Sequence, residues 1–255
     1  SASMRVLPVC ALLLAAFAGA ARAQTMLDQE ERLIEIASLL IAVPPDNAPG
    51  AYRPGQLALG MEIVGIPAIN GQTGGKTQIT PRDKTPLFPR LRLAYGLPAP
   101  DDFRAFVGLA YIPPIPINDV QSHLGALEAG FAWAPDSPFT VGVRATVLLA
   151  TSKSPVTEPD TKDTLDNFEY GGDVSTGYRF DFGRTRLTPF ASVGVTRVNG
   201  DFTVTSDNYT LTSHTTNLGL TGGLRLGYGR IEGLAEVVVW PGRLVHPTFS
   251  VAWLF

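Results

Sequence analysis

Apolar residues alternate with small or polar residues in segment after segment of this chain, from Gly55 to its last residue, Phe255. Successive side chains of a β-strand point to opposite faces, so a period of two predicts strands with one apolar and one polar face. About ten such segments occur, each close to the roughly 9–11 residues that a tilted strand needs to cross a membrane. The predicted strands are Gln56–Ile66, Leu87–Leu97, Phe103–Ile112, His123–Trp133, Phe139–Thr151, Phe168–Phe180, Thr185–Val198, Thr215–Tyr228, Ile231–Trp240 and Thr248–Phe255.

The connections between these strands alternate between short and long. The short ones are Pro98–Asp102, Ala134–Pro138, Asp181–Arg184 and Gly229–Arg230. The longer ones are Pro67–Pro86, Pro113–Ser122, Ser152–Asn167, Asn199–His214 and, the smallest, Pro241–Pro247. Short periplasmic turns, longer extracellular loops and an even strand number are typical of transmembrane barrels and place both chain ends on the short-turn side. We therefore predict an all-β, antiparallel up-and-down transmembrane barrel of about ten strands over residues 55–255.

The first residues predict export from the cytoplasm. Ser1–Ser3 precede Met4 and are interpreted as a cloning remnant, after which an apolar stretch, Val6–Ala18, leads to the sequence Ala21–Ala23. This pattern is typical of a secretory signal peptide with its cleavage site, so residues 1–23 are expected to be removed. Cys10 precedes most of the apolar stretch, which argues against a lipoprotein anchor. The exported chain would then have no cysteine for a disulfide or a thiolate metal site.

The last predicted strand places Phe249, Val251, Trp253 and Phe255 on one face. With its signal peptide, alternating strands and terminal aromatic residue, the chain resembles small porin-like outer-membrane β-barrel proteins of Gram-negative bacteria. The resemblance implies that these four residues are the signal by which the barrel-assembly machinery recognises the chain. It also implies an outer-membrane location in contact with lipid and lipopolysaccharide.

A short amphipathic helix is predicted over Met26–Val43, with acidic residues in its first turn and two prolines after its end. Acidic side chains are favourable near a helix N-terminus, and proline ends a helix. Residues 24–54 are thus expected to form a periplasmic helix and a linker. Two alternatives remain open for this helix: it caps or plugs the periplasmic mouth of the barrel, or it docks an envelope protein.

The alternation assigns the two faces of each strand. Outward-facing apolar residues are expected at Leu57, Leu59, Met61, Ile63, Leu91, Leu93, Tyr95, Val107, Leu109, Tyr111, Val141, Val143, Val147, Val193, Val195, Leu218, Leu220, Leu224 and Leu226. Thirteen charged residues are then expected in the lumen: Glu62, Arg90, Arg92, Arg104, Glu128, Arg144, Glu169, Asp173, Arg179, Arg186, Arg225, Glu232 and Glu236. Glycines on the same face make room for long side chains or for water: Gly108, Gly130, Gly142, Gly194, Gly219 and Gly223.

The nearly equal numbers of inward-facing arginines and carboxylates favour a salt-bridge network that fills the lumen, since unpaired charges in a narrow bore are costly. The alternative is a charged constriction that selects small solutes.

No motif for catalysis, cofactor binding or metal binding is predicted. The loop Asn70–Thr77 resembles a phosphate-binding loop but lacks its first glycine, and three histidines, at 123, 214 and 246, fall too far apart to form one site. The acidic loop from Glu158 to Asp166 does not have the spacing of a calcium loop. The formal net charge of −3 excludes a basic surface for nucleic acid.

These observations predict a non-enzymatic outer-membrane barrel that acts as an anchor or interaction subunit of a cell-envelope complex. It would hold protein partners through its extracellular loops or its N-terminal helix. A narrow porin-like diffusion channel for small solutes is the alternative, and an outer-membrane enzyme is a distant third.

Overall fold

The computed structural model describes residues 26–43, 49–50, 52–65, 88–117, 120–135, 137–158, 161–206 and 208–255. The signal peptide predicted over residues 1–23 and the predicted loop Pro67–Pro86 lie outside these residues. The described chain contains the helix α2, Met26–Ile41. Its strands are β1 Leu57–Val64, β2 Phe88–Leu97, β3 Phe103–Ile112, β4 Pro116–Ile117, β5 Val120–Trp133, β6 Phe139–Glu158, β7 Thr161–Tyr178, β8 Phe180–Phe182, β9 Thr185–Val204, β10 Tyr209–Tyr228, β11 Ile231–Trp240 and β12 Leu244–Leu254.

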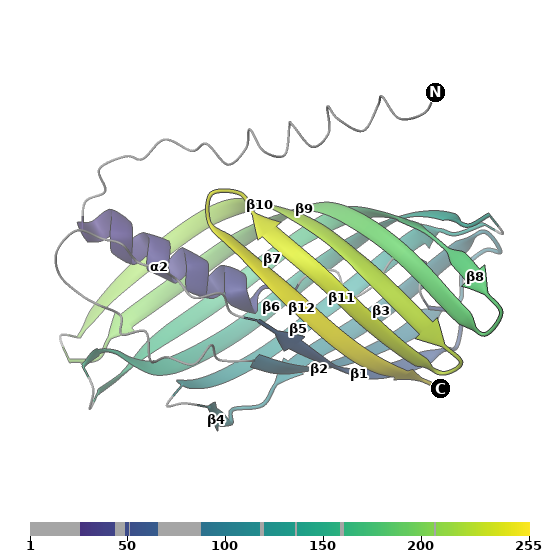
Figure 1. Cartoon of the computed structure of the whole chain (residues 1–255). Helices are drawn as coiled ribbons and strands as arrows, with labels where there is room; N and C mark the ends of the chain where they lie inside the picture. The colour runs from purple at the N-terminus through teal and green to yellow at the C-terminus, as the bar shows by residue number, and fades with distance from the viewer. Residues whose placement is uncertain are drawn as a thin grey trace.

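Ten of these strands form a closed antiparallel ring in chain order, and the short β4 and β8 pair only with β5 and β9 (Figure 1). The first and last strands close the ring, with Leu59 opposite Trp253 and Met61 opposite Val251. Every backbone group along the ring can therefore pair with a neighbouring strand, which is the condition for spanning lipid with strands. The predicted ten-strand up-and-down barrel is confirmed.

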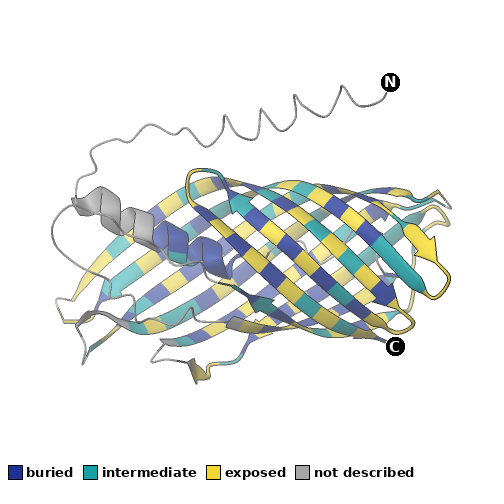
Figure 2. Ribbon diagram, in the orientation of Figure 1, coloured by how far each residue is buried: buried dark blue, intermediate teal, exposed yellow. Residues whose placement is uncertain are grey.

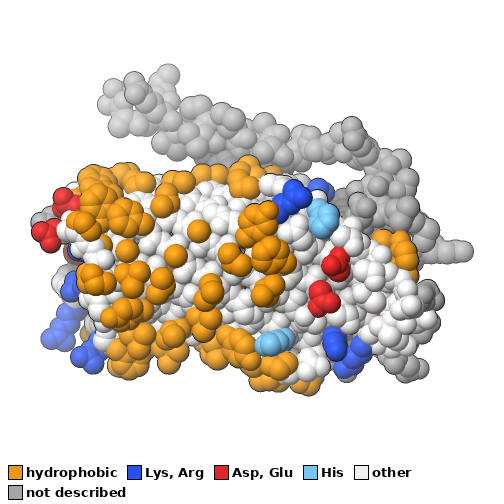
Figure 3. Space-filling model, turned by 180° about the vertical axis from the view of Figure 1, so that it is seen from behind, with side chains coloured by type: hydrophobic (Ala, Val, Ile, Leu, Met, Phe, Trp, Pro, Cys, Tyr) orange, Lys and Arg blue, Asp and Glu red, His pale blue; other side chains and the backbone are white. Residues whose placement is uncertain are grey.

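The two faces of the sheet alternate along every strand (Figure 2). Large apolar side chains are exposed on the outside, among them Leu59, Met61, Leu93 and Val143, while small and charged residues face inward. Figure 3 shows apolar side chains gathered over one part of the barrel wall, with charged residues toward the two ends. An apolar outer surface of this extent on a closed barrel is suited to lipid rather than to water.

Four neighbouring strands, β6, β7, β9 and β10, have 18 to 20 residues each and exceed the predicted lengths. Their additional residues form a sheet that we call the extended wall: residues 151–158, 161–167, 197–204 and 209–216. Its outer face is polar, as at Asp166, Asp201 and His214. The prediction of loops at Ser152–Asn167 and Asn199–His214 was therefore wrong in large part. The alternation of apolar and polar residues that marks a membrane-crossing strand disappears once both faces meet water or protein.

Helix α2 lies inside the barrel, at the end that carries the extended wall (Figure 1). Leu39 and Leu40 are buried against Val198 of β9 and against Val238 and Trp240 of β11. Ile41 is buried against residues of three further strands, Ala110, Ile112, Leu124, Ala126, Leu148 and Ala150. The C-terminal half of the helix is thus packed inside the barrel. In the part of the chain that the structure describes, no helix is both long and apolar enough to cross a membrane.

The position of the helix corrects the prediction of a periplasmic helix. Tyr52, which comes after the helix in the chain, packs on Ala58, Ala94 and Leu254 at the opposite, short-turn end, where β1 begins. Because short turns face the periplasm in bacterial barrels, the helix occupies the extracellular half of the lumen. Sequence amphipathicity could not reveal this, because an apolar stripe packs equally well at either end of a barrel.

Candidate functional site in the barrel lumen

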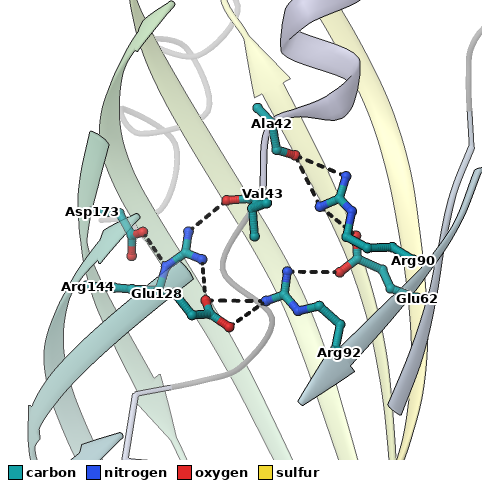
Figure 4. Close-up of polar contacts among 8 residues, drawn as sticks. All are labelled: Ala42, Val43, Glu62, Arg90, Arg92, Glu128, Arg144 and Asp173. Carbon is teal, nitrogen blue, oxygen red and sulfur yellow. Dashed lines mark hydrogen bonds and ion pairs between the residues drawn. The ribbon is translucent and has the colours of Figure 1, made fainter. Parts of the chain in front are cut away.

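An unbroken chain of ion pairs crosses the middle of the lumen (Figure 4). Glu62 of β1 contacts Arg90 and Arg92 of β2, each at 3.2 Å between nitrogen and oxygen. Arg92 also contacts Glu128 of β5 at 3.1 Å, and Glu128 contacts Arg144 of β6 at 2.9 Å. The chain ends where Arg144 contacts Asp173 of β7 at 2.8 Å. Cationic and anionic groups from five strands therefore alternate along the inside of the barrel.

One glycine makes possible the contact between Arg92 and Glu128, which passes over a whole strand. Strand β3 lies between Arg92 on β2 and Glu128 on β5, and it presents Gly108 to the lumen at that level. A Cβ atom at Gly108 would lie 2.6 Å from Oε1 and 2.7 Å from Cγ of Glu128. A larger residue would displace this carboxylate. At this position the room predicted for inward glycines is filled by a side chain.

The same arginines hold the C-terminal end of helix α2. Nη2 of Arg90 donates to the carbonyl oxygen of Ile41 at 3.1 Å, and Nη1 donates to that of Ala42 at 3.4 Å. Nη2 of Arg144 donates to the carbonyl oxygen of Val43 at 3.1 Å. The helix has no basic residue in its own last turn. The barrel wall supplies the positive charge that a helix C-terminus favours and satisfies carbonyl groups that the helix leaves without partners.

Further contacts fix the helix along its length. The hydroxyl of Ser38 lies 2.8 Å from Oδ1 of Asn167, and Glu35 forms an ion pair of 2.8 Å with Arg243 in the turn between β11 and β12. Gly200 permits a close approach, because a Cβ atom there would lie 3.1 Å from Cγ2 of Ile34. None of these contacts could be predicted from the sequence, since a single polar residue on an amphipathic helix does not indicate its partner.

The remaining predicted lumen charges separate into two groups. Arg225 is paired with Glu232, and Arg104, Arg179 and Arg186 lie with them around a cavity at the short-turn end. Arg104 donates to backbone carbonyl groups, whereas Arg179 pairs with the exposed Asp181. The second group, Glu169 and Glu236, is buried in the wall, and Oε1 of Glu169 has no hydrogen-bond donor among the described residues. Only six of the thirteen predicted residues form the continuous chain.

The four residues of the predicted assembly signal, Phe249, Val251, Trp253 and Phe255, all project from the outer surface. Three of them lie opposite Leu59, Met61 and Ile63 across the seam that closes the ring. The structure does not test their recognition by assembly factors.

The three histidines lie in separate places. His123 packs edge-on against Tyr111, His214 contacts Asn199 on the extended wall, and His246 is buried in the lumen. Among the described residues, no group of three or more histidine, cysteine or acidic residues could hold a metal ion.

No protein-family model and no curated protein matches this sequence. The solved structures that it resembles are outer-membrane barrels. The translocator domain of the autotransporter NalP from Neisseria meningitidis is 10% identical and aligns over 88% of this chain and 94% of that one, with a TM-score of 0.49. The β domain of the Bordetella autotransporter BrkA, also 10% identical, aligns over 78% of this chain and 98% of that one, with a TM-score of 0.41. The attachment protein Ail of Yersinia pestis is 13% identical over 80% of this chain and all of its own length, with a TM-score of 0.34.

The closed ring, the apolar outer surface and the charged interior define the class of protein. The chain is an integral β-barrel of the Gram-negative outer membrane.

Proposed function

We propose that this protein is a non-enzymatic anchor or interaction subunit of a cell-envelope complex, with a lumen that is closed to solutes. The supporting observation is the position of helix α2, whose C-terminal half is buried on all sides by the barrel. Next to the end of the helix, the ion-pair chain lies in the bore, and two of its arginines bind the last carbonyl groups of the helix. A solute would have to displace both.

The surface for protein partners lies at the extracellular end. Because the C-terminal half of the helix is packed in the lumen, we place the contacts with protein partners on the barrel rather than on the helix. The extended wall instead presents paired polar groups beyond the apolar belt, such as Asp166 with Thr151 at 2.6 Å and Asp201 with Thr212 at 2.7 Å. A rigid polar sheet of this kind holds the extracellular connections above the membrane, where they can contact envelope proteins or lipopolysaccharide.

A narrow diffusion channel for small solutes is the second candidate function. It is favoured by a cavity of about 250 Å³ at the periplasmic end of the lumen. For this cavity to become part of a pore, the helix would have to leave the lumen and the ion pairs between Arg92, Glu128 and Arg144 would have to separate.

Single-channel recordings of the full chain in planar lipid bilayers distinguish the two functions. A closed anchor gives no stable conductance steps, even at high protein occupancy. Regular steps of uniform size, with a reproducible preference for anions or cations, would overturn the anchor and establish the channel. Heat-dependent migration on gels, measured on the same sample, shows that the protein in the bilayer is folded.

A further inference from the structure

Five arginines converge on the cavity at the periplasmic end of the lumen. The cavity is lined by Arg53 of the N-terminal segment and by four arginines of the barrel wall, at positions 104, 179, 186 and 225. Glu232 is the one acidic residue in its lining, and it is already paired with Arg225. Pro49 and Gly50 also line the cavity. The strand ends and the N-terminal segment thus build a partly open, positively charged space.

Within the residues that the structure describes, most of this positive charge is not neutralised by carboxylates. Arg179 contacts Asp181, but both side chains are close to half exposed. The guanidinium group of Arg104 contacts only backbone carbonyl oxygens. In the part of the chain that the structure describes, the guanidinium groups of Arg53 and Arg186 have no acidic side chain within ion-pair distance. This differs from the middle of the lumen, where each arginine of the ion-pair chain contacts a carboxylate.

We propose that this cavity is a binding site for a small anion that carries phosphate groups and reaches it from the periplasm. Like-charged groups gathered in one space repel one another, and a bound anion removes that cost. Guanidinium groups bind phosphate through paired, charge-assisted hydrogen bonds. The volume of about 250 Å³ is below the range of drug-sized pockets and suits a compact ligand with one or two phosphate groups. This inference does not depend on whether the barrel conducts.

Isothermal titration of the folded full chain with pyrophosphate, in a detergent without phosphate, tests the site. We expect saturable binding of one pyrophosphate per chain. Arg186→Gln and Arg53→Gln should each weaken binding about tenfold, the loss that follows from removing one hydrogen bond to a charged group. Heat-dependent gel migration should be the same for these variants and the parent, because neither side chain forms an ion pair within the described residues.

Matched controls come from two arginines in turns at the same end of the barrel, Arg184 and Arg230, which are exposed and do not line the cavity. Arg184→Gln and Arg230→Gln remove the same charge and should change affinity by less than about twofold, because water and salt screen exposed charges. Absence of saturable binding would overturn the proposal. Equal weakening in all four variants would also overturn it, because this would indicate diffuse attraction to the positive end of the barrel.

The source of the phosphate is determined by repeating the titration in nanodiscs of phosphatidylglycerol. A soluble ligand is supported if pyrophosphate binds there with the affinity seen in detergent. Loss of pyrophosphate binding in the nanodiscs would show that lipid headgroups occupy the cavity and would overturn a soluble periplasmic ligand.

Discussion

Arginine is suited to this interior because one planar guanidinium group can serve several acceptors at once. Arg144 contacts Glu128, Asp173 and the carbonyl oxygen of Val43, and so joins two carboxylates of the wall to the end of the helix. Lysine carries a single point charge and could not reproduce this geometry. Buried ion pairs contribute little net stability when complete, but they are costly when one partner is removed.

The first prediction concerns Arg144. Arg144→Leu should lower the free energy of unfolding by about 3–5 kcal/mol, because it leaves Glu128 and Asp173 with an uncompensated charge in the lumen. Val143→Leu changes the neighbouring residue, which faces lipid, and should have little effect. Urea denaturation in lipid vesicles, followed by the heat-modifiable gel band, measures both variants. Equal stability of the two would show that the ion-pair chain does not support the barrel.

The second prediction concerns the space above Gly108. Gly108→Val should destabilise the barrel by about 1–3 kcal/mol, since its side chain would displace the Glu128 carboxylate from Arg92. Gly222→Val is the control, because the corresponding position faces outward into open space. The same urea titration compares the two. A larger loss in the Gly222 variant would contradict the role given to Gly108.

Residue patterns predicted which side chains point inward but not which ones meet. Period-two alternation placed Arg92 and Glu128 in the lumen, yet their contact passes over a whole strand and depends on the stagger of the barrel. Arg104, Arg179 and Arg186 satisfied the same alternation, but they lie near strand ends, and therefore surround a cavity at the mouth. Arg53 was missed because the linker that contains it has no periodicity.

At the scale of elements, the alternation in the sequence predicts the ends of a strand correctly where one face of that strand contacts lipid. The bounds of β3 and β11 were predicted without error, because both strands lie entirely within the apolar belt. The start of β6 and the end of β10 were also predicted correctly, but both strands continue past the belt at their other ends, which alternation could not predict. The helix itself was predicted to within two residues of its end, but its location in the lumen depends on contacts with distant strands.

The third prediction concerns the seam of the barrel. Strand β12 pairs with β1, and the backbone nitrogen of Phe255 donates to the carbonyl oxygen of Leu57 at 2.9 Å. Phe255→Ser keeps this hydrogen bond but removes an outer aromatic side chain and the predicted assembly signal. The amount of folded protein in outer-membrane fractions should fall. Phe168→Ser, which removes an exposed aromatic residue from β7, should reduce it less; an equal reduction would argue against a special role for the terminal residue.

At the scale of the whole molecule, the N-terminal segment and the barrel form one folded unit. The fourth prediction is that deletion of Thr25–Pro45 leaves a folded barrel of lower stability, because Arg90 and Arg144 lose the carbonyl groups of residues 41–43. Planar-bilayer recordings of the deletion variant should still show no stable conductance steps, because the ion pairs between Arg92, Glu128 and Arg144 remain in the bore. Regular conductance steps after deletion would mean that the helix alone closes the bore.

The most direct test of this account is a disulfide between the helix and the barrel wall. A Cβ atom at Gly200 would lie 3.5 Å from the hydroxyl oxygen of Ser38, a spacing close to that of paired cysteines. In a chain with Cys10→Ser, the double variant Ser38→Cys and Gly200→Cys should form an intramolecular disulfide on mild oxidation of the folded barrel. Ser38→Cys with Gly222→Cys, on the outer face, should stay reduced. Free thiols in both pairs after oxidation, in barrels that keep the heat-dependent gel migration of the parent, would contradict a helix in the lumen.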